Sequence, residues 1–389
     1  MKPTVQRESP RAAATPAIRQ LQAFALRWPV RVPVRTSFGT MHDRPAVLVR
    51  VEDDEGAHGW GEVWCNFPSC GAEHRARLVE TVLAPLLCGT AWASPAAAYD
   101  TLTRQTAVLA LQTGEPGPIA QAIAGVDIAL HDLAARRAGL PLWRALGGTR
   151  STVEVYASGI NPERPAEVLG TLSATGYTRF KLKVGFGRER DVGNLQAMRD
   201  AAPAGAMLMV DANQAWDLQT ASEMAQMLAP LQPAWLEEPL RADRPWLEWQ
   251  ALAAASPVPL AGGENMIGET AFDAMLASRA LAVVQPDLAK WGGVSGVLRV
   301  IERIAAAGLR YCPHYLGAGI GLLASAHVLA ARGAADGLLE IDSNENPLRS
   351  LLAPALASLE HGRIDIGDGV GLGVEPDLAL CRELCAPRG

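Results

Sequence analysis

The chain has 389 residues, of which 49% are hydrophobic and 20% are charged, and this ordinary globular balance excludes a disordered or fibrous protein. The length fits two domains, or one large barrel with an attached unit. Lys and Arg number 35 against 41 Asp and Glu, so the net charge is −6, and without a basic run the chain is not expected to bind nucleic acid.

Targeting signals are not evident in the sequence. No stretch reaches about 18 uncharged apolar residues, so no transmembrane helix and no membrane partner are expected. The first 20 residues lack the apolar core of a signal peptide. The six cysteines include no CxxC pair, which favours reduced thiols over a disulfide scaffold. We therefore expect a soluble, cytoplasmic protein, and most such chains of this size are enzymes.

The first part of the chain predicts a small α+β unit. Residues 1–18 show no periodicity and are expected to form a disordered leader. From about 20 to 64, apolar runs separated by turn residues predict three strands, with a hairpin turn at 53–56. A helical texture then follows and ends at Gly139 and Pro141.

After residue 148 the pattern becomes periodic. Eight short apolar runs alternate with helix-like stretches, and seven of the runs end in an ionisable residue at intervals of 23 to 28 residues. Such an interval accommodates one strand, one helix and two short loops, so the pattern predicts a (β/α)8 barrel. A doubly wound sheet is disfavoured because no G-x-G-x-x-G follows a first strand. The end points are Lys183, Asp211, Glu237, Glu264, Asp287, His314 and Glu340.

Three of these end points predict a metal site. The C-terminal ends of barrel strands meet at one mouth, so Asp211, Glu237 and Glu264 should lie close together. Carboxylate oxygens without His or Cys suit Mg2+, whereas zinc prefers nitrogen or sulfur. A single acid after a strand is often only a helix N-cap or a solvated charge. Seven ionisable ends in succession favour a metal or a reaction.

Two further groups are candidate bases. Lys181 and Lys183 stand two residues apart on one strand, so their side chains point to the same face. If this face lines the barrel, each ammonium group should lower the pKa of the other, which would favour proton acceptance. The alternative is a pair of solvated lysines. His314 and Asp287 close neighbouring strands, and the carboxylate should fix the imidazole tautomer and raise its basicity. His327 lies in an apolar helical stretch and is expected to be structural.

From about residue 20 the chain resembles the enolase superfamily and, within it, the mandelate racemase / muconate lactonizing enzyme family and its mandelate racemase subgroup. The similar segments are AIAGVDIALHDLAARRAGLPLWRALGG, which departs at Ala145 where a leucine is usual, and the pair VDAN…LEEP. KLK, GGEN, QPDLAKWGG, CPH and LLE also occur in the expected order. The resemblance implies an α+β capping domain at 19–148, a modified TIM barrel at 149–360, and a C-terminal segment, 361–389, returning to the capping domain.

The resemblance also implies a role for each residue at the mouth. The implied ligands of Mg2+, with Mn2+ as a substitute, are Asp211, Glu237 and Glu264. Lys183 is the implied base on one face of the substrate, and His314 with Asp287 acts on the other face. Lys181 is implied as electrostatic support, Asn213 as a residue near the substrate, and Glu340 as the hydrogen-bonding partner of the developing enolate.

The implied reaction removes the proton α to a carboxylate and forms an enediolate. Reprotonation from the opposite base would racemise or epimerise a 2-hydroxy acid, whereas loss of a β-hydroxyl would give a 2-keto acid. The subgroup resemblance and the polar run DSNEN after Glu340 favour dehydration of a sugar acid, while Trp64 and Phe67 would suit an apolar substituent. A non-catalytic, metal-dependent acid-binding barrel is a further alternative. A homo-oligomer is expected.

Two segments of the capping domain, 35–45 and 63–71, mix turn residues, polar groups and aromatics. Such a surface is suited to cover the mouth over Lys183 and His314 and to select the substrate. Phe38, Trp64 and Phe67 could instead pack the core of the capping domain. The residues predicted to approach the mouth are His42, Trp64, Asn66 and Phe67.

Overall fold

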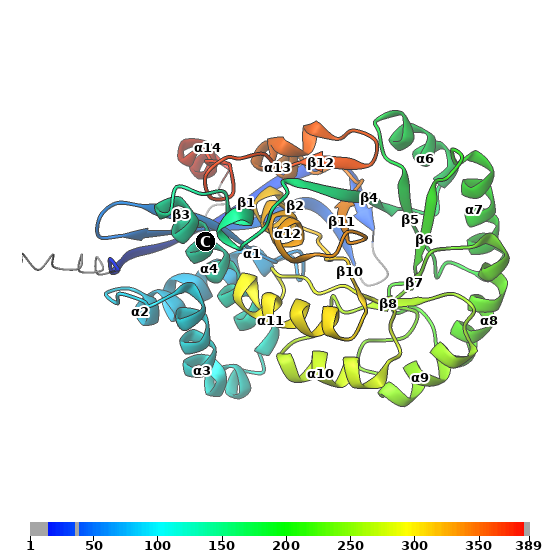
Figure 1. Cartoon of the computed structure of the whole chain (residues 1–389), viewed down its shortest axis with the longest axis horizontal. Helices are drawn as coiled ribbons and strands as arrows, with labels where there is room; N and C mark the ends of the chain where they lie inside the picture. The colour runs from blue at the N-terminus through cyan, green and yellow to red at the C-terminus, as the bar shows by residue number, and fades with distance from the viewer. Residues whose placement is uncertain (1–14, 36–38, 385–389) are drawn as a thin grey trace, which may run out of the picture.

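The structure is a computed structural model that describes residues 15–35 and 39–384. Figure 1 shows a capping unit beside a barrel, with helices α6 to α10 on the outer side of the barrel strands. The capping unit contains β1 (Ile18–Arg35), β2 (Thr40–Asp53), β3 (His58–Val63), α1 (Gly71–Leu78), α2 (Ala84–Leu87), α3 (Pro95–Thr113), α4 (Pro116–Arg137) and α5 (Leu142–Ala145).

The three strands of the capping unit form one antiparallel sheet in the order β1-β2-β3. The turn predicted at 53–56 is confirmed, because Asp53 Oδ1 accepts hydrogen bonds from the backbone N–H of Glu55 and Ala57 at 3.1 and 3.0 Å. Two expectations need correction. Strand β1 begins at Ile18, within the predicted leader, whose first 14 residues lie outside the described chain. Strand β2 begins at Thr40, so residues 40–45 are strand and not loop.

Helix α4 lies between the sheet of the capping unit and the barrel, contacting both β3 and α11 (Gly293–Ala306). Small residues permit its close approach to β3. A Cβ atom on Gly61 would lie 2.0 Å from the Gly125 carbonyl oxygen, so only glycine fits there. Because β3 and α11 both pack against α4, most of the helix is covered, which explains its apolar sequence.

Eight parallel strands form the nearly closed barrel, and each lies within or overlaps a predicted apolar run. Hydrogen bonding links them in the order β10-β9-β8-β7-β6-β5-β4-β11. The strands are β4 (Thr152–Ile160), β5 (Arg179–Lys183), β6 (Met207–Asp211), β7 (Leu236–Glu237), β8 (Leu260–Gly262), β9 (Val283–Val284), β10 (Arg310–Tyr311) and β11 (Leu338–Asp342).

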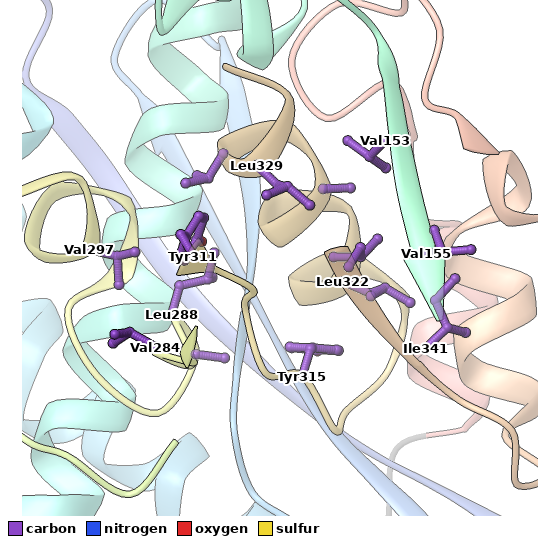
Figure 2. Packing of buried hydrophobic residues seen from close by; sticks show 14 of the residues in the cluster. Val153, Val155, Val284, Leu288, Val297, Tyr311, Tyr315, Leu322, Leu329 and Ile341 are labelled. Atoms are coloured by element: carbon purple, nitrogen blue, oxygen red, sulfur yellow. The ribbon is translucent and has the colours of Figure 1, made fainter. Parts of the chain in front are cut away.

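Helices alternate with these strands and cover the barrel. Figure 2 shows Leu322 and Leu329 of α12 between Tyr311 of β10 and Val153 of β4, on the side of the barrel where the strand path is interrupted. Burial of these side chains holds that side together by the hydrophobic effect. The helices are α6 (Pro165–Ala174), α7 (Arg188–Ala201), α8 (Leu218–Leu228), α9 (Trp246–Ala255), α10 (Glu269–Ser278), α11 and α12 (Gly319–Arg332).

The C-terminal segment crosses from the barrel to the capping unit. It follows α13 (Pro347–Leu352) and contains β12 (Arg363–Asp365), which pairs antiparallel with β4, and α14 (Leu378–Glu383). Further on, the Leu372 N–H donates to Asp132 Oδ1 of α4 at 2.7 Å, and Trp60 Nε1 of β3 donates to Glu375 at 3.0 Å. In the described part of the chain, no helix combines the length and apolarity needed to cross a membrane.

His327 of α12 provides a test of the interface between the units. Its side chain is fully buried, and its Nδ1 accepts the Trp143 N–H at 3.1 Å. Burial lowers the pKa of His327 from 6.5 to about 4, so the unfolded chain binds a proton at a higher pH than the folded chain does. The contribution of neutral, buried His327 to the free energy of unfolding is therefore fully present above pH 6.5. About 3 kcal/mol of it is lost as the pH falls from 6.5 to 4.

The measurement is the urea unfolding free energy of the wild type, His327→Gln and His361→Gln from pH 7 to 4. His327→Gln should reduce the pH slope by about one proton. His361→Gln, at an exposed position, is the control for loss of a histidine. An unchanged slope in His327→Gln would show that this histidine titrates normally.

Candidate active site

The strand register brings the predicted metal ligands together. Asp211 pairs with Lys183 on one side and with Glu237 on the other, so three functional groups end adjacent strands at the same level. Glu264 follows β8 after Gly263, whose φ of +131° and whose 3.0 Å approach to the Gln285 backbone exclude a side chain. Asp211 and Glu237 are each 1% exposed.

Each predicted ligand carboxylate faces a cationic side chain. Lys181 Nζ lies 2.5 Å from Glu237 Oε1 and 2.8 Å from an oxygen of Glu340. Lys183 Nζ lies 2.8 Å from Asp211 Oδ2 and 2.5 Å from Asn213 Oδ1.

Lys181 does act to lower the pKa of Lys183, as expected, but the expected net shift toward neutrality is wrong for this arrangement. Burial does lower the pKa of Lys183, but the Asp211 carboxylate outweighs it, and the net pKa is raised. For Lys181 too, burial acts downward, yet Glu237 and Glu340 raise its pKa well above the ordinary value. Opposite charges at close range thus outweigh the repulsion between the ammonium groups.

The imidazole of His314 lies between two carboxylates. Its Nδ1 is 2.8 Å from Asp287 Oδ2, and its Nε2 is 3.0 Å from Glu264 Oε2. Asp287 is oriented by the N–H groups of Ala289 and Lys290, which donate to its Oδ1 at 2.9 and 3.1 Å. Burial acts to lower the pKa of His314, but Glu264, Glu340 and Asp287 together raise it to about 9.

The donor set fits a hard divalent cation. Among the residues described, no three Asp, Glu, His or Cys side chains already converge as metal ligands. Nevertheless, several buried carboxylates lie at one mouth, and burial together with Asp211, Glu340 and Glu264 raises the pKa of Glu237 to about 7 despite the opposing Lys181. A cation with oxygen preference would relieve this repulsion, so the residues present suit Mg2+.

A cavity of about 250 Å3 adjoins Glu264 and Asn213 between the capping unit and the barrel. Its polar lining includes the side chains of Gln121 and Gln214 beside the Glu264 carboxylate. Gln121 Oε1 accepts from Arg75 and Gln214 Oε1 accepts from the Ala242 N–H, so the amide nitrogens of both are left for a ligand. The lining residues are Trp64, Gln121, Asn213, Gln214, Glu264, Asn265, Ile267 and Lys290.

Of the four capping residues predicted at the mouth, only Trp64 lines this cavity. Asn66 is buried, and its side-chain nitrogen donates to the Leu316 carbonyl at 2.6 Å. Phe67 packs against Gly39, the residue before β2, where a Cβ atom would lie 2.6 Å from the Phe67 ring. His42 is exposed on β2. Phe38 lies outside the described residues.

Sequence reasoning missed two charged residues at the mouth. Lys290 Nζ lies 3.0 Å from Glu264 Oε1 and 5.1 Å from the centre of the Trp64 ring. The buried Glu238 carboxylate accepts hydrogen bonds from Asn265 Nδ2 at both of its oxygens, each at 3.0 Å. Lys290 stands three residues after Asp287 in QPDLAKWGG, and Glu238 is the second acid of LEEP, so both lay within motifs already recognised.

A buried ion pair joins the two units beside the mouth. Arg44 Nη2 of β2 lies 2.9 Å from Asp342 Oδ2, and the side chains are 1% and 4% exposed. Asp342 is two residues after Glu340 on β11 and therefore shares its inward face, one step nearer the mouth. Arg349 Nη1 lies 3.8 Å from the same carboxylate oxygen. This wall of the mouth is charged, not apolar.

Removal of one partner of this pair should be costly. Arg44→Leu leaves Asp342 buried and facing Arg349 at 3.8 Å, and should lower the free energy of unfolding by about 3 kcal/mol. The double variant Arg44→Leu/Asp342→Leu should recover most of that loss. Urea unfolding of both variants is the measurement, and equal destabilisation in the two would show that packing, and not charge, accounts for the effect.

The fold and site define a capped-barrel enzyme with acidic, ammonium and imidazole groups at the mouth. Residues 18–147 match the family model described as mandelate racemase / muconate lactonizing enzyme, N-terminal domain, and residues 164–380 match that described as enolase C-terminal domain-like. The chain therefore belongs to the mandelate racemase / muconate lactonizing enzyme family of the enolase superfamily and is an enzyme of the lyase or isomerase type.

Individual relatives agree with this assignment. The chain is 30% identical over 354 residues to D-galactarolactone cycloisomerase of Agrobacterium fabrum, covering 85% of this chain and 89% of that protein. It is 28% identical to arabinonate dehydratase of Saccharolobus solfataricus, with coverage of 85% and 88%. A solved mandelate racemase/muconate lactonizing enzyme from Bordetella bronchiseptica RB50 superposes with a TM-score of 0.91 at 62% identity, covering 96% of this chain and all of that one.

Magnesium occurs in one of the solved relatives. A racemase from Streptomyces coelicolor A3(2) was solved with bound magnesium and superposes with a TM-score of 0.84 at 28% identity, covering 95% of this chain and all of that one.

Proposed function

We propose that the protein catalyses the Mg2+-dependent dehydration of a sugar acid, or a related hydroxy acid, to a 2-keto acid. Asp211, Glu237 and Glu264 would hold the ion, with Mn2+ as a substitute. When bound, the ion would stabilise negative charge on the substrate carboxylate. The observation that carries the choice of substrate is the cavity next to Glu264, where the amide nitrogens of Gln121 and Gln214 can donate, because hydroxyl and carboxylate oxygens accept hydrogen bonds and an apolar substituent does not.

The residues of the chain divide the remaining work. Lys183 and His314 are the proposed bases, and Asp287 holds His314 in one tautomer. Glu340, paired with Lys181, would share charge that develops on the substrate. Asn213 would contact the substrate from beside Lys183.

In the proposed reaction, one base removes the proton from Cα. The electron pair of that bond forms a C=C bond as the β-hydroxyl leaves, protonated by the other group in its acidic form, and one water is released. The resulting enol tautomerises to the 2-keto acid. Glu264, Glu340 and Asp287 raise the pKa of His314 despite its burial, which favours the protonated form that an acid needs.

Racemisation or epimerisation is the second candidate. It is favoured by one observation, the presence of candidate proton carriers on different strands, Lys183 on β5 and His314 after β10. If they face opposite sides of the substrate, a proton taken by one could be replaced by the other. A relative that dehydrates arabinonate and the polar wall at Arg44 and Asp342 support dehydration instead.

A panel of 2-hydroxy acids, including sugar monoacids, sugar diacids and mandelate, tests the proposal with Mg2+ in D2O. We expect 2-keto acid from at least one sugar acid and none from mandelate. Deuterium at Cα without keto acid would favour the racemase or epimerase. Neither 2-keto acid nor exchange with any acid would contradict both candidates.

The cavity is tested by Gln214→Leu, with Gln196→Leu on the exposed face of α7 as its control. The first should raise KM for the sugar acid by about tenfold, the value of one hydrogen bond of about 1.4 kcal/mol, and the control should leave KM unchanged. Equal KM values in all three proteins would place the substrate elsewhere.

A further inference from the structure

The loop that carries His314 is fastened by the capping unit. Glu62 of β3 is 1% exposed and reaches the N-terminus of α12. Its Oε1 accepts the Ala318 N–H at 2.6 Å, and its Oε2 accepts the Gly321 N–H at 2.9 Å. These donors begin four residues after His314, so one carboxylate from the capping unit fixes the far end of the loop.

Two more side chains hold the middle of the same loop. Asn66, three residues beyond the end of β3, donates to the Leu316 carbonyl at 2.6 Å. Asn346, at the start of α13, donates to the Gly317 carbonyl at 2.8 Å. The backbone between His314 and α12 is thus held from the capping unit and from the barrel.

Packing transmits this restraint to His314. Tyr315, its neighbour in the chain, is 3% exposed. A Cβ on Gly317 or on Gly321 would lie 2.4 Å from the Tyr315 hydroxyl, so there is no room for this ring to move toward either residue. A shift of the loop at Ala318 must therefore also displace Tyr315, and His314 with it.

We propose that Glu62, assisted by Asn66, is a positioning residue for His314: it fixes the loop so that the imidazole keeps Asp287 at Nδ1 and presents Nε2 to the substrate. The inference rests on the proposed function in so far as His314 acts as a base or acid. Lys183 is held separately on β5 by Asp211 and Asn213. Loss of the Glu62 contacts should therefore affect one face of the substrate and not the other.

The test is Glu62→Gln, which keeps the volume but turns one acceptor into a donor facing a backbone N–H. Deuterium exchange at the His314 face should fall between about tenfold and a hundredfold, the effect of a displacement near 1 Å. Exchange at the Lys183 face and the affinity for Mg2+ should stay within about twofold. Asn66→Ala should show the same selectivity, and it decides the matter if Glu62→Gln does not fold.

Asp132→Asn is the matched control. Asp132 is likewise a buried carboxylate of the capping unit that accepts two backbone N–H groups, from Trp60 at 2.8 Å and from Leu372 at 2.7 Å, but it bonds neither to the His314 loop nor to α12. Its replacement should lower stability without selectivity between the faces. An equal fall at both faces in folded Glu62→Gln, or no fall at either, would overturn the positioning role.

A failure of the proposed function is distinguishable from a failure of this inference. If the wild type neither exchanges a proton nor forms a 2-keto acid with any acid, the function is wrong, and the positioning role is read from the imidazole 15N signals instead. Glu62→Gln should then alter the His314 signals, which report the Nδ1 contact to Asp287, and leave those of His327 unchanged. Unaltered His314 signals would overturn the inference.

Discussion

Lys183→Ala and His314→Asn are expected to abolish proton exchange at opposite faces of the substrate, each by at least about a hundredfold, the range of general acid–base catalysis. The reason is that the two groups reach the mouth from different strands and are held by different carboxylates, Asp211 and Asp287. The measurement is deuterium uptake at Cα for both enantiomers, or both epimers, of an acid that the wild type accepts.

The control for the histidine is His58→Asn, because His58 pairs with Glu375 far from the mouth in this structure. It should exchange like the wild type. If Lys183→Ala and His314→Asn gave the same residual pattern, the two groups would act on one face, and the racemase candidate would lose its basis.

Removal of the metal is expected to abolish activity, and Mg2+ or Mn2+ should restore it. Asp211→Asn should weaken Mg2+ binding by at least about a hundredfold, because it removes one charge from a set of only three proposed ligands. Calorimetric titration with Mg2+ measures this without reference to turnover.

Glu238→Gln is the matched control, since Glu238 adjoins the proposed ligand Glu237 in the same LEEP segment. Burial, and next the neighbouring Glu264, raise the pKa of Glu238 well above its ordinary value, and glutamine keeps the volume of this side chain. Its Mg2+ affinity should remain within a few fold of the wild type. Full activity after exhaustive chelation would contradict the metal assignment.

The positions of the strand ends could be predicted from the sequence for a physical reason. The apolar period of each strand and the turn residues after it are local, and parallel strands must bring their C-terminal ends to one mouth. Lys183, Asp211 and Glu237 could therefore be placed together before their contacts were seen, and the register does pair them.

Local patterns did not indicate how charge is distributed among these groups. The spacing of Lys181 and Lys183 suggested mutual repulsion, but strands β6 and β7 place Asp211 and Glu237 against them, and attraction outweighs repulsion. The capping loops show the same limit. Asn66 carries a polar group into the region of the mouth, yet packing turns its amide onto the Leu316 carbonyl.

The sequence by itself therefore determined the family, the barrel with its capping unit, and the set of ionisable groups that end the strands, because all of these follow from short-range periodicity and motif order. Only the tertiary structure decided which side chains meet across the two units. Arg44 with Asp342 and Glu62 with the start of α12 join residues more than 250 positions apart. No periodicity relates such residues, because their contact depends on how the capping sheet docks on the barrel, and docking is set by the packing of both surfaces.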